Sequence, residues 1–486
     1  MPDLSPLPLT IVEAAEWLRS GKITSVALTE AQLARCHASQ DTLAAFILLM
    51  DETALAAAAQ ADADFAAGID KGPLQGIPIG VKDIIATKDA PSTANSRVLD
   101  PEWGNRDDAL VVKKLRAAGA VIIGKLGLHE YALGWPDPDT GFRIPKNPWD
   151  LERTPGGSSS GTGAAVGGGL ILAGLGTDTG GSIRGPASYC GISGIKQTFG
   201  LVSKEGCVPL GYSLDHIGPM ARTARDCAIL LQIMAGYDPA DLCSVDVPVP
   251  DMTALMTGSL EGVRIGVPRD YFFTVPNLDP EVKASVEAAL AAMEAAGATL
   301  VEVSIPHAET ARHAQRITMM GEAYAYHEPD LQARPELYGK YTRASFQLGA
   351  FFTAADYINA QRVRPLIRDE CAAAFGDADN GGVDVLVVPS MATVAPTFAG
   401  YDPDSIMRSY GFTPIWNLTG LPAISIPCGF SEGGLPIGMQ VVGRPFDEPT
   451  VFKVADAYQQ ITDWHLTVPP IATDLATELA KEALPA

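Results

Sequence analysis

The sequence predicts an α/β protein with a central β-sheet, and its pattern of elements carries this prediction. Amphipathic helical segments alternate with short apolar strands along most of the chain. One arrangement occurs twice. A helix that ends at Gly119 precedes a strand at 120–123, and a helix at 280–296, closed by Gly297, precedes a strand at 299–305. Hydrophobic residues make up 47% of the 486 residues and charged residues 19%, as in soluble globular proteins.

The elements before Gly119 are expected to be mostly helical. Apolar residues recur at helical spacing in 11–18 and 26–36, and an alanine-rich continuation follows at 54–67. The segment 76–85 is short, apolar and bounded by glycine and proline, which predicts a buried strand or a buried turn. Asp107 or Asp108 is expected to cap the helix that ends at Gly119.

The second half of the chain repeats the alternation. Four further apolar runs predict strands, at 263–267, 383–388, 423–427 and 437–442. Residues 306–380 form a longer, mostly helical stretch with scattered aromatic residues, which we interpret as a helical cover over the sheet. Because no repeat or low-complexity linker divides the chain, we expect a single domain over residues 1–486.

Charge and cysteine usage exclude several functional classes. The net charge of −22 disfavours direct binding to nucleic acid or to anionic membranes. The seven cysteines contain no C-x-x-C pair, which points to reduced thiols and away from a disulfide framework or a zinc site. The first ten residues lack a basic residue, unlike a signal peptide, and the apolar run at 164–175 is too short to span a bilayer. We therefore expect a cytoplasmic protein without a membrane segment.

Two glycine-rich turns hold serines 24 positions apart, Ser158 and Ser182. Glycine lets backbone N–H groups approach a reacting atom closely, because no Cβ blocks the way. The run Thr179, Gly180, Gly181 and Ser182 can aim successive N–H groups at one spot, with the Ser182 hydroxyl at its edge. It therefore predicts a nucleophile beside an oxyanion hole, in which one donor typically contributes about 3 kcal/mol.

Lys82 is the candidate base for this nucleophile. Its sequence neighbours are apolar, and burial lowers the pKa of a lysine so that a neutral amine can exist near neutral pH. Ser158 could relay the proton between Lys82 and Ser182. Asp178 and Arg184 flank the nucleophile with opposite charges and are expected to form a structural ion pair.

Other patterns compete with this interpretation. Residues 157–161 formally match the G-x-S-x-G nucleophile elbow, which would make Ser159 the nucleophile with a late histidine such as His465. The elbow needs a strand directly before it, and residues 152–156 are a poor strand. Residues 119–125 imitate a phosphate-binding loop but lack the final Ser or Thr. The histidines show no metal-ligand spacing, so no metal site is expected.

The sequence resembles the amidase signature family over roughly residues 8–466. The matching motifs are Gly-Ile-Pro-Ile-Gly-Val-Lys-Asp at 76–83, Asn-Pro-Trp-Asp at 147–150, Pro-Gly-Gly-Ser-Ser at 155–159, the block 176–191, Asp-His-Ile-Gly-Pro-Met at 215–220 and Leu-Pro-Ala-Ile-Ser-Ile-Pro at 421–427. The resemblance implies a Ser–cisSer–Lys triad of Ser182, Ser158 and Lys82, with a cis peptide bond at Ser158. It also implies a single α/β domain with a large mixed sheet covered by helices on both faces, and no cofactor or metal.

Two departures and one pocket segment stand out against the family pattern. Ser160 replaces a usual glycine, and Gln197 stands where proline is common. The family's acyl pocket is lined near residues 128–141, so Tyr131 and Trp135 could recognise an aromatic or apolar substrate. The alternative is that both side chains only pack.

The resemblance implies hydrolysis of carboxamide bonds in small acyl or aryl amides, with esters or carbamates as further substrates, by a monomer or homodimer. An alternative lies within the same family, because residues 203–238 and 417–464 are similar to the catalytic A subunit of tRNA-dependent amidotransferases. Such a protein would hydrolyse glutamine and pass ammonia to a partner subunit. Arg364 would then be a candidate for holding a substrate carboxylate, or else a helix-surface arginine.

Overall fold

A computed structural model describes residues 7–104, 107–133, 135–377, 381–400 and 411–475. Within these ranges one sheet of eleven strands runs through the molecule in the order β1-β3-β2-β4-β6-β5-β10-β11-β9-β7-β8. The strands are β1 (Phe46–Leu49), β2 (Pro78–Lys82), β3 (Val121–Leu126), β4 (Ala173–Asp178), β5 (Ser193–Lys196), β6 (His216–Ala221), β7 (Arg264–Pro268), β8 (Thr299–Val303), β9 (Val385–Pro389), β10 (Ala423–Phe430) and β11 (Pro436–Val442).

The sheet is mixed, as the family resemblance implies. Strand β2 is parallel to both neighbours, β3 and β4, and β7 is parallel to β8 and β9. From β4 through β6, β5, β10 and β11 to β9, successive neighbours are antiparallel. The predicted α/β class with a large mixed sheet is therefore confirmed.

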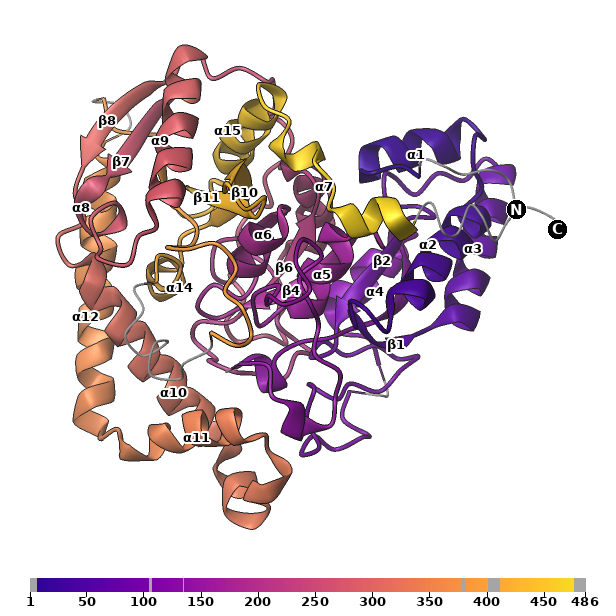
Figure 1. The fold of residues 1–486 in the computed structure, drawn as a ribbon, viewed down its shortest axis with the longest axis horizontal. Coiled ribbons are helices and arrows are strands. Elements are labelled where there is room, and N and C mark those ends of the chain that lie inside the picture. Colours follow the sequence, from indigo (N-terminus) through magenta and orange to yellow (C-terminus); the bar gives the residue numbers. More distant parts are fainter. Residues whose placement is uncertain (1–6, 105–106, 134, 378–380, 401–410, 476–486) are drawn as a thin grey trace.

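Helices surround the sheet along its whole length (Figure 1). The α-helices are α1 (Ile11–Arg19), α2 (Ser25–Ser39), α3 (Asp51–Ala66), α4 (Leu110–Ala117), α5 (Ser160–Gly167), α6 (Arg184–Cys190), α7 (Ala224–Met234), α8 (Arg269–Phe272), α9 (Pro280–Ala295), α10 (Ala308–Ala333), α11 (Lys340–Leu348), α12 (Ala354–Phe375), α14 (Pro414–Thr419) and α15 (Glu448–Gln460). Helices α1 to α3 lie at the β1 end, and α9 lies beside β7 and β8 at the other end.

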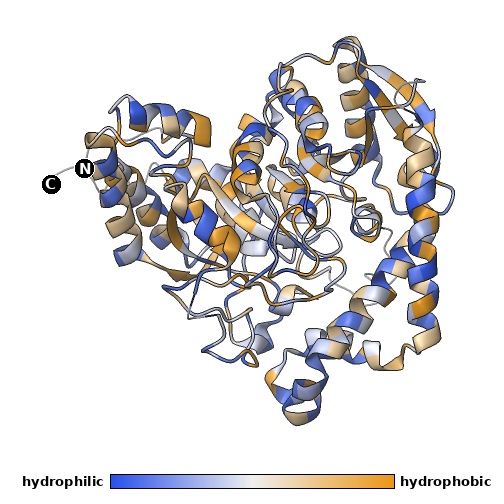
Figure 2. Ribbon diagram, turned by 180° about the vertical axis from the view of Figure 1, so that it is seen from behind, coloured by the Kyte–Doolittle hydropathy of each residue, from blue (hydrophilic) through white to orange (hydrophobic). Residues whose placement is uncertain are grey.

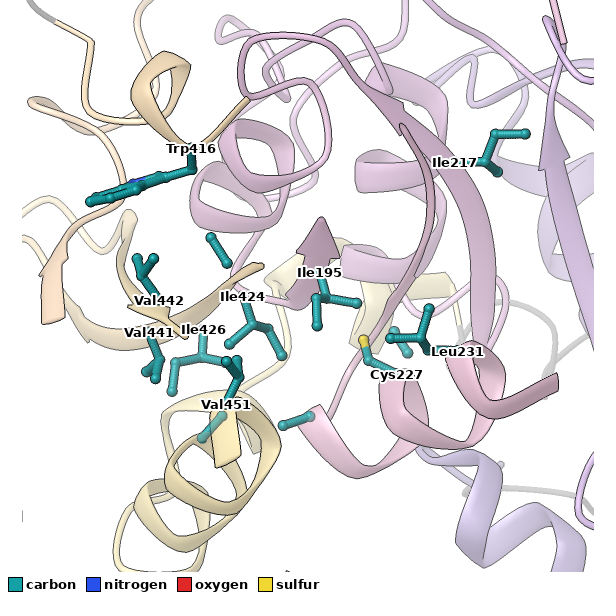
Figure 3. Packing of buried hydrophobic residues seen from close by; sticks show 14 of the residues in the cluster. Ile195, Ile217, Cys227, Leu231, Trp416, Ile424, Ile426, Val441, Val442 and Val451 are labelled. Atoms are coloured by element: carbon teal, nitrogen blue, oxygen red, sulfur yellow. The ribbon is translucent and has the colours of Figure 1, made fainter. Parts of the chain in front are cut away.

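Both faces of the sheet are buried under helices, and β5 shows how. A Cβ at Gly194 would touch Ile183 and Ala187 at the start of α6, at 2.8 and 3.0 Å. Because side chains alternate across a strand, the next residue, Ile195, points to the opposite face. There it joins the hydrophobic cluster that contains Cys227 and other residues of α7 and α15 (Figure 3). Glycine on β5 thus lets α6, which carries the site, approach the sheet closely.

The sequence located most outer strands but not the central ones. Strands β2, β3, β7, β8, β9, β10 and β11 overlap the predicted segments. Strands β4, β5 and β6 were not predicted, because their glycine-rich sequences lack β-branched alternation. The predicted cap of α4 was wrong: Ala109 caps it without a side-chain hydrogen bond, while Asp108 accepts from the Lys88 N–H at 2.9 Å.

Helices α10, α11 and α12 occupy 308–375, within the stretch interpreted as a helical cover. Helices α10 and α12 pack side by side and extend beyond the sheet, and α10 also contacts α14 (Figure 1). Polar and apolar residues alternate along both long helices (Figure 2). Among the helices of the described ranges, none combines the length and the apolar character that crossing a membrane requires.

Candidate active site

Lys82 is the last residue of β2, a strand that is fully buried between β3 and β4. Its side chain is 0% exposed, and its Nζ lies 2.8 Å from Ser158 Oγ, 3.0 Å from Ser159 Oγ and 2.7 Å from Thr177 Oγ1. Burial away from water lowers the pKa of Lys82 to about 7. A largely neutral amine is therefore available near neutral pH, as the sequence predicted.

Ser158 is held at the end of the turn that leads into α5. The peptide bond between Gly157 and Ser158 is cis, as the resemblance implies. The carbonyl of Ser158 accepts the backbone N–H of His129 at 3.1 Å, and any Cβ at position 157 would overlap the His129 ring. The backbone of Ser158 is thus fixed while its hydroxyl faces Lys82.

Ser182 lies in the turn between β4 and α6 and is half-buried. Its carbonyl accepts the Ser159 N–H at 3.2 Å, which joins the two serine-bearing turns. Within the described part of the chain, the Ser182 hydroxyl forms no hydrogen bond. The structure therefore brings Lys82 and Ser158 into direct contact and places Ser182 beside them, without a hydrogen bond between the two serine hydroxyls.

The backbone donors around Ser182 are not equivalent. The Gly181 N–H donates to Asp178 Oδ1 at 2.7 Å, so this group is already occupied. This corrects the prediction that all four N–H groups of 179–182 are available to an oxyanion. Among the described residues, none accepts a hydrogen bond from the N–H of Thr179, Gly180 or Ser182.

Asp178 and Arg184 form the structural ion pair that the sequence predicted. Both side chains are 0% exposed, and Arg184 Nη2 lies 2.9 Å from Asp178 Oδ1. Burial alone would raise the pKa of Asp178, but the guanidinium of Arg184 and the amide of Asn417 outweigh it and hold that pKa below its usual range. Asp178 also accepts the N–H groups of Gly181 and Ile183, so the pair shapes the turn that carries Ser182.

The two predicted pocket residues differ in exposure. Tyr131 is 2% exposed, and its ring packs against those of His327, Tyr338 and Phe346 from the helical cover. This environment matches the packing alternative. Trp135 is half-buried, with its ring centroid 6.4 Å from that of His129. A substrate contact by either residue stays a prediction.

Two neighbours of Lys82, Ser159 and Thr177, were not predicted as parts of the site. Ser159 had been considered only as an alternative nucleophile, but its side chain is fully buried between Lys82 and the backbone of Thr177. No strand ends directly before it, so the elbow alternative is wrong. The position of Thr177, two residues before Thr179 on the same strand edge, was the available signal.

Arg364 lies on α12, apart from the triad. Its Nη2 lies 3.2 Å from the Ser213 carbonyl, and the side chain borders a cavity of about 660 Å³. A smaller cavity of about 200 Å³ is lined by Thr177 and Thr179 and thus adjoins the site. Nowhere in the described ranges do three or more His, Cys, Asp or Glu side chains gather in a way that could hold a metal ion.

Comparisons with known proteins agree with this site. The Amidase family matches residues 27–452. The chain is 43% identical to the A subunit of the glutamyl-tRNA(Gln) amidotransferase of Chloroflexus aggregans, over 96% of this chain and 98% of that protein.

Solved structures of amide-cleaving relatives share the fold. The peptide amidase from Stenotrophomonas maltophilia superposes with a TM-score of 0.81 at 30% identity, covering 94% of this chain and 97% of that one. A chain from a vestigial complex described for the origins of an s-triazine catabolic enzyme gives a TM-score of 0.85 at 30% identity, covering 93% and 98%. The family match spans most of the chain and the Chloroflexus relative nearly all of it, so the chain belongs to the amidase signature family of enzymes that act on amides.

Proposed function

We propose that this enzyme hydrolyses the side-chain carboxamide of glutamine as the A-type component of a glutamine-dependent amidotransferase. The observation that carries the proposal is the 43% identity to the A subunit of a glutamyl-tRNA(Gln) amidotransferase, because it extends over 96% of this chain and 98% of the relative. This identity favours the sequence-based alternative over the first expectation of a small acyl or aryl amide.

The proposed mechanism uses the side chains around Lys82. The neutral amine of Lys82 takes a proton through Ser158 from the Ser182 hydroxyl, which attacks the carboxamide carbon. The free N–H groups of Thr179, Gly180 and Ser182 stabilise the oxyanion. Ser158 then gives a proton to the departing nitrogen, ammonia leaves, and water hydrolyses the acyl-enzyme by the same relay.

A second candidate function is that of a stand-alone amidase on small amides, esters or carbamates. The observation that favours it is the TM-score of 0.85 to the chain linked with an s-triazine catabolic enzyme, which exceeds the value of 0.77 to the amidotransferase protein of Thermotoga maritima. Such an enzyme would use the same proton relay and would need no partner.

A reconstitution experiment separates the two functions. This chain would replace its counterpart in the glutamyl-tRNA(Gln) amidotransferase of Chloroflexus aggregans, and glutamine-dependent amidation of Glu-tRNA(Gln) would be measured with Ser182→Ala as the control. We expect Ser182-dependent amidation. An inactive hybrid, together with Ser182-dependent turnover of anilides, p-nitrophenyl esters or carbamates by the single chain, would contradict the amidotransferase role and support the second candidate.

The pKa of Lys82 predicts how the rate depends on pH. The neutral amine is the active form, so kcat/KM is expected to fall about tenfold per unit below pH 7 and to level off above it. The profile is measured from pH 5 to 9 with an activated ester that the Ser182→Ala variant does not turn over. A flat profile across pH 6 to 8 would contradict Lys82 as the base.

The proposed role also implies where and with what the chain works. Glutamyl-tRNA amidation is a cytoplasmic reaction, and the cytoplasm is a reducing compartment, in which the seven free cysteines are typical. The expected partners are the other components of the amidotransferase and, through them, the charged tRNA. The monomer or homodimer expected from sequence belongs to the second candidate.

A further inference from the structure

The peptide groups around Ser182 are each held in place by a side chain from another part of the chain. The carbonyl of Thr179 accepts Gln315 Nε2 at 2.9 Å, and the carbonyl of Gly180 accepts Thr413 Oγ1 at 2.7 Å. One of these holders, Gln315, belongs to α10 and therefore to the helical cover.

These contacts determine where the N–H groups point. A peptide group is planar and trans, so its N–H points away from its C=O. Thr413, on the Gly180 carbonyl, therefore orients the Gly181 N–H, which Asp178 already occupies. Gln315, on the Thr179 carbonyl, orients the Gly180 N–H, which is available for an oxyanion.

Gln315 is well placed to keep this orientation. It is 3% exposed, and a Cβ at Gly180 would lie 2.9 Å from its Nε2, so the amide packs directly on the turn. Its Nε2 also contacts Met319 Sδ at 3.6 Å, one helical turn further along α10. The glutamine reaches the turn from a helix more than 130 residues away in sequence, and no motif of the triad includes it.

We infer that Gln315 is a positioning residue for the oxyanion hole, acting through the peptide group between Thr179 and Gly180. The inference rests on the proposed Ser182 chemistry. It makes α10 part of the catalytic machinery, since loss of the amide would let one donor of the hole rotate away from the developing charge. The effect belongs to the transition state, because the ground-state carbonyl of a substrate carries little charge.

The test uses Gln315→Met, which keeps the length of the side chain and removes the donor, and Gln315→Glu, which places an acceptor against the Thr179 carbonyl. We expect kcat to fall by about 10- to 100-fold in the methionine variant, below the loss typical of a deleted donor, and further in the glutamate variant, with KM nearly unchanged. Affinity for an aldehyde or trifluoromethyl ketone that forms a tetrahedral adduct with Ser182 should fall in parallel with kcat.

Gln361→Met is the matched control. Gln361 lies on α12 and donates to Thr318 Oγ1 of α10 at 2.9 Å, so its loss disturbs the cover without touching the turn. We expect this control to keep wild-type kcat and inhibitor affinity. Gln315 variants that match the control, or that change only KM, would overturn the inference while Ser182-dependent turnover persists. Turnover that survives Ser182→Ala would instead contradict the proposed function, and the positioning role with it.

Discussion

Lys82→Ala is expected to lower kcat by about 10³-fold or more, because the proton of Ser182 would lose its acceptor. The variant also empties the point at which three hydroxyl groups meet, those of Ser158, Ser159 and Thr177. Steady-state hydrolysis of an activated ester and of an amide measures the effect. Activity within a few-fold of the wild type would contradict Lys82 as the base.

A neighbouring lysine provides the control for this experiment. Lys125 on β3 is also 0% exposed, but its Nζ contacts Asp83, Ser92 and the Ile85 carbonyl, and none of the serines of the site. Lys125→Met should lower stability, because Asp83 loses its cation, yet keep kcat per folded molecule. A kcat loss of equal size in both variants would mean that any buried lysine is needed for the fold alone.

Asp178→Ala is expected to destabilise the fold by about 3–5 kcal/mol, because it leaves Arg184 buried without its counter-charge. The N–H groups of Gly181 and Ile183 would also lose their acceptor. The free energy of unfolding from urea titration measures this effect.

A more exposed pair serves as the comparison. Asp150 and Arg153 form an ion pair at 2.9 Å, with side chains 39% and 27% exposed. Asp150→Ala should cost no more than about 1 kcal/mol, because water screens both charges. A loss of similar size in both variants would show that Asp178 is a minor contributor to stability.

The site could be predicted from sequence to the extent that its groups lie in contiguous motifs. Lys82, Ser158 and Ser182 stand in glycine-rich segments whose composition indicates close backbone approach. The ion pair of Asp178 and Arg184 was predicted for the same reason, since both residues flank the turn.

The remaining parts of the site depend on contacts between distant segments. Gln315 and Thr413 meet the Ser182 turn from α10 and from the start of α14, and no spacing rule connects them to it. The occupied N–H of Gly181 was not predictable either, because it depends on which carboxylate oxygen faces the turn. Central strands such as β4 were missed because burial on both faces, and not side-chain alternation, makes them strands.

The positions of the site residues along the chain divide the labour of the enzyme. The groups proposed to do the chemistry lie between Lys82 and Ser182, whereas Gln315 and Thr413 reach them from the carboxy-terminal half. In a chimera that exchanged 308–375 with a relative, the nucleophile and base would stay intact. Such a graft would nevertheless inherit the donor's setting of the Gly180 peptide, so turnover would change together with the covering helices.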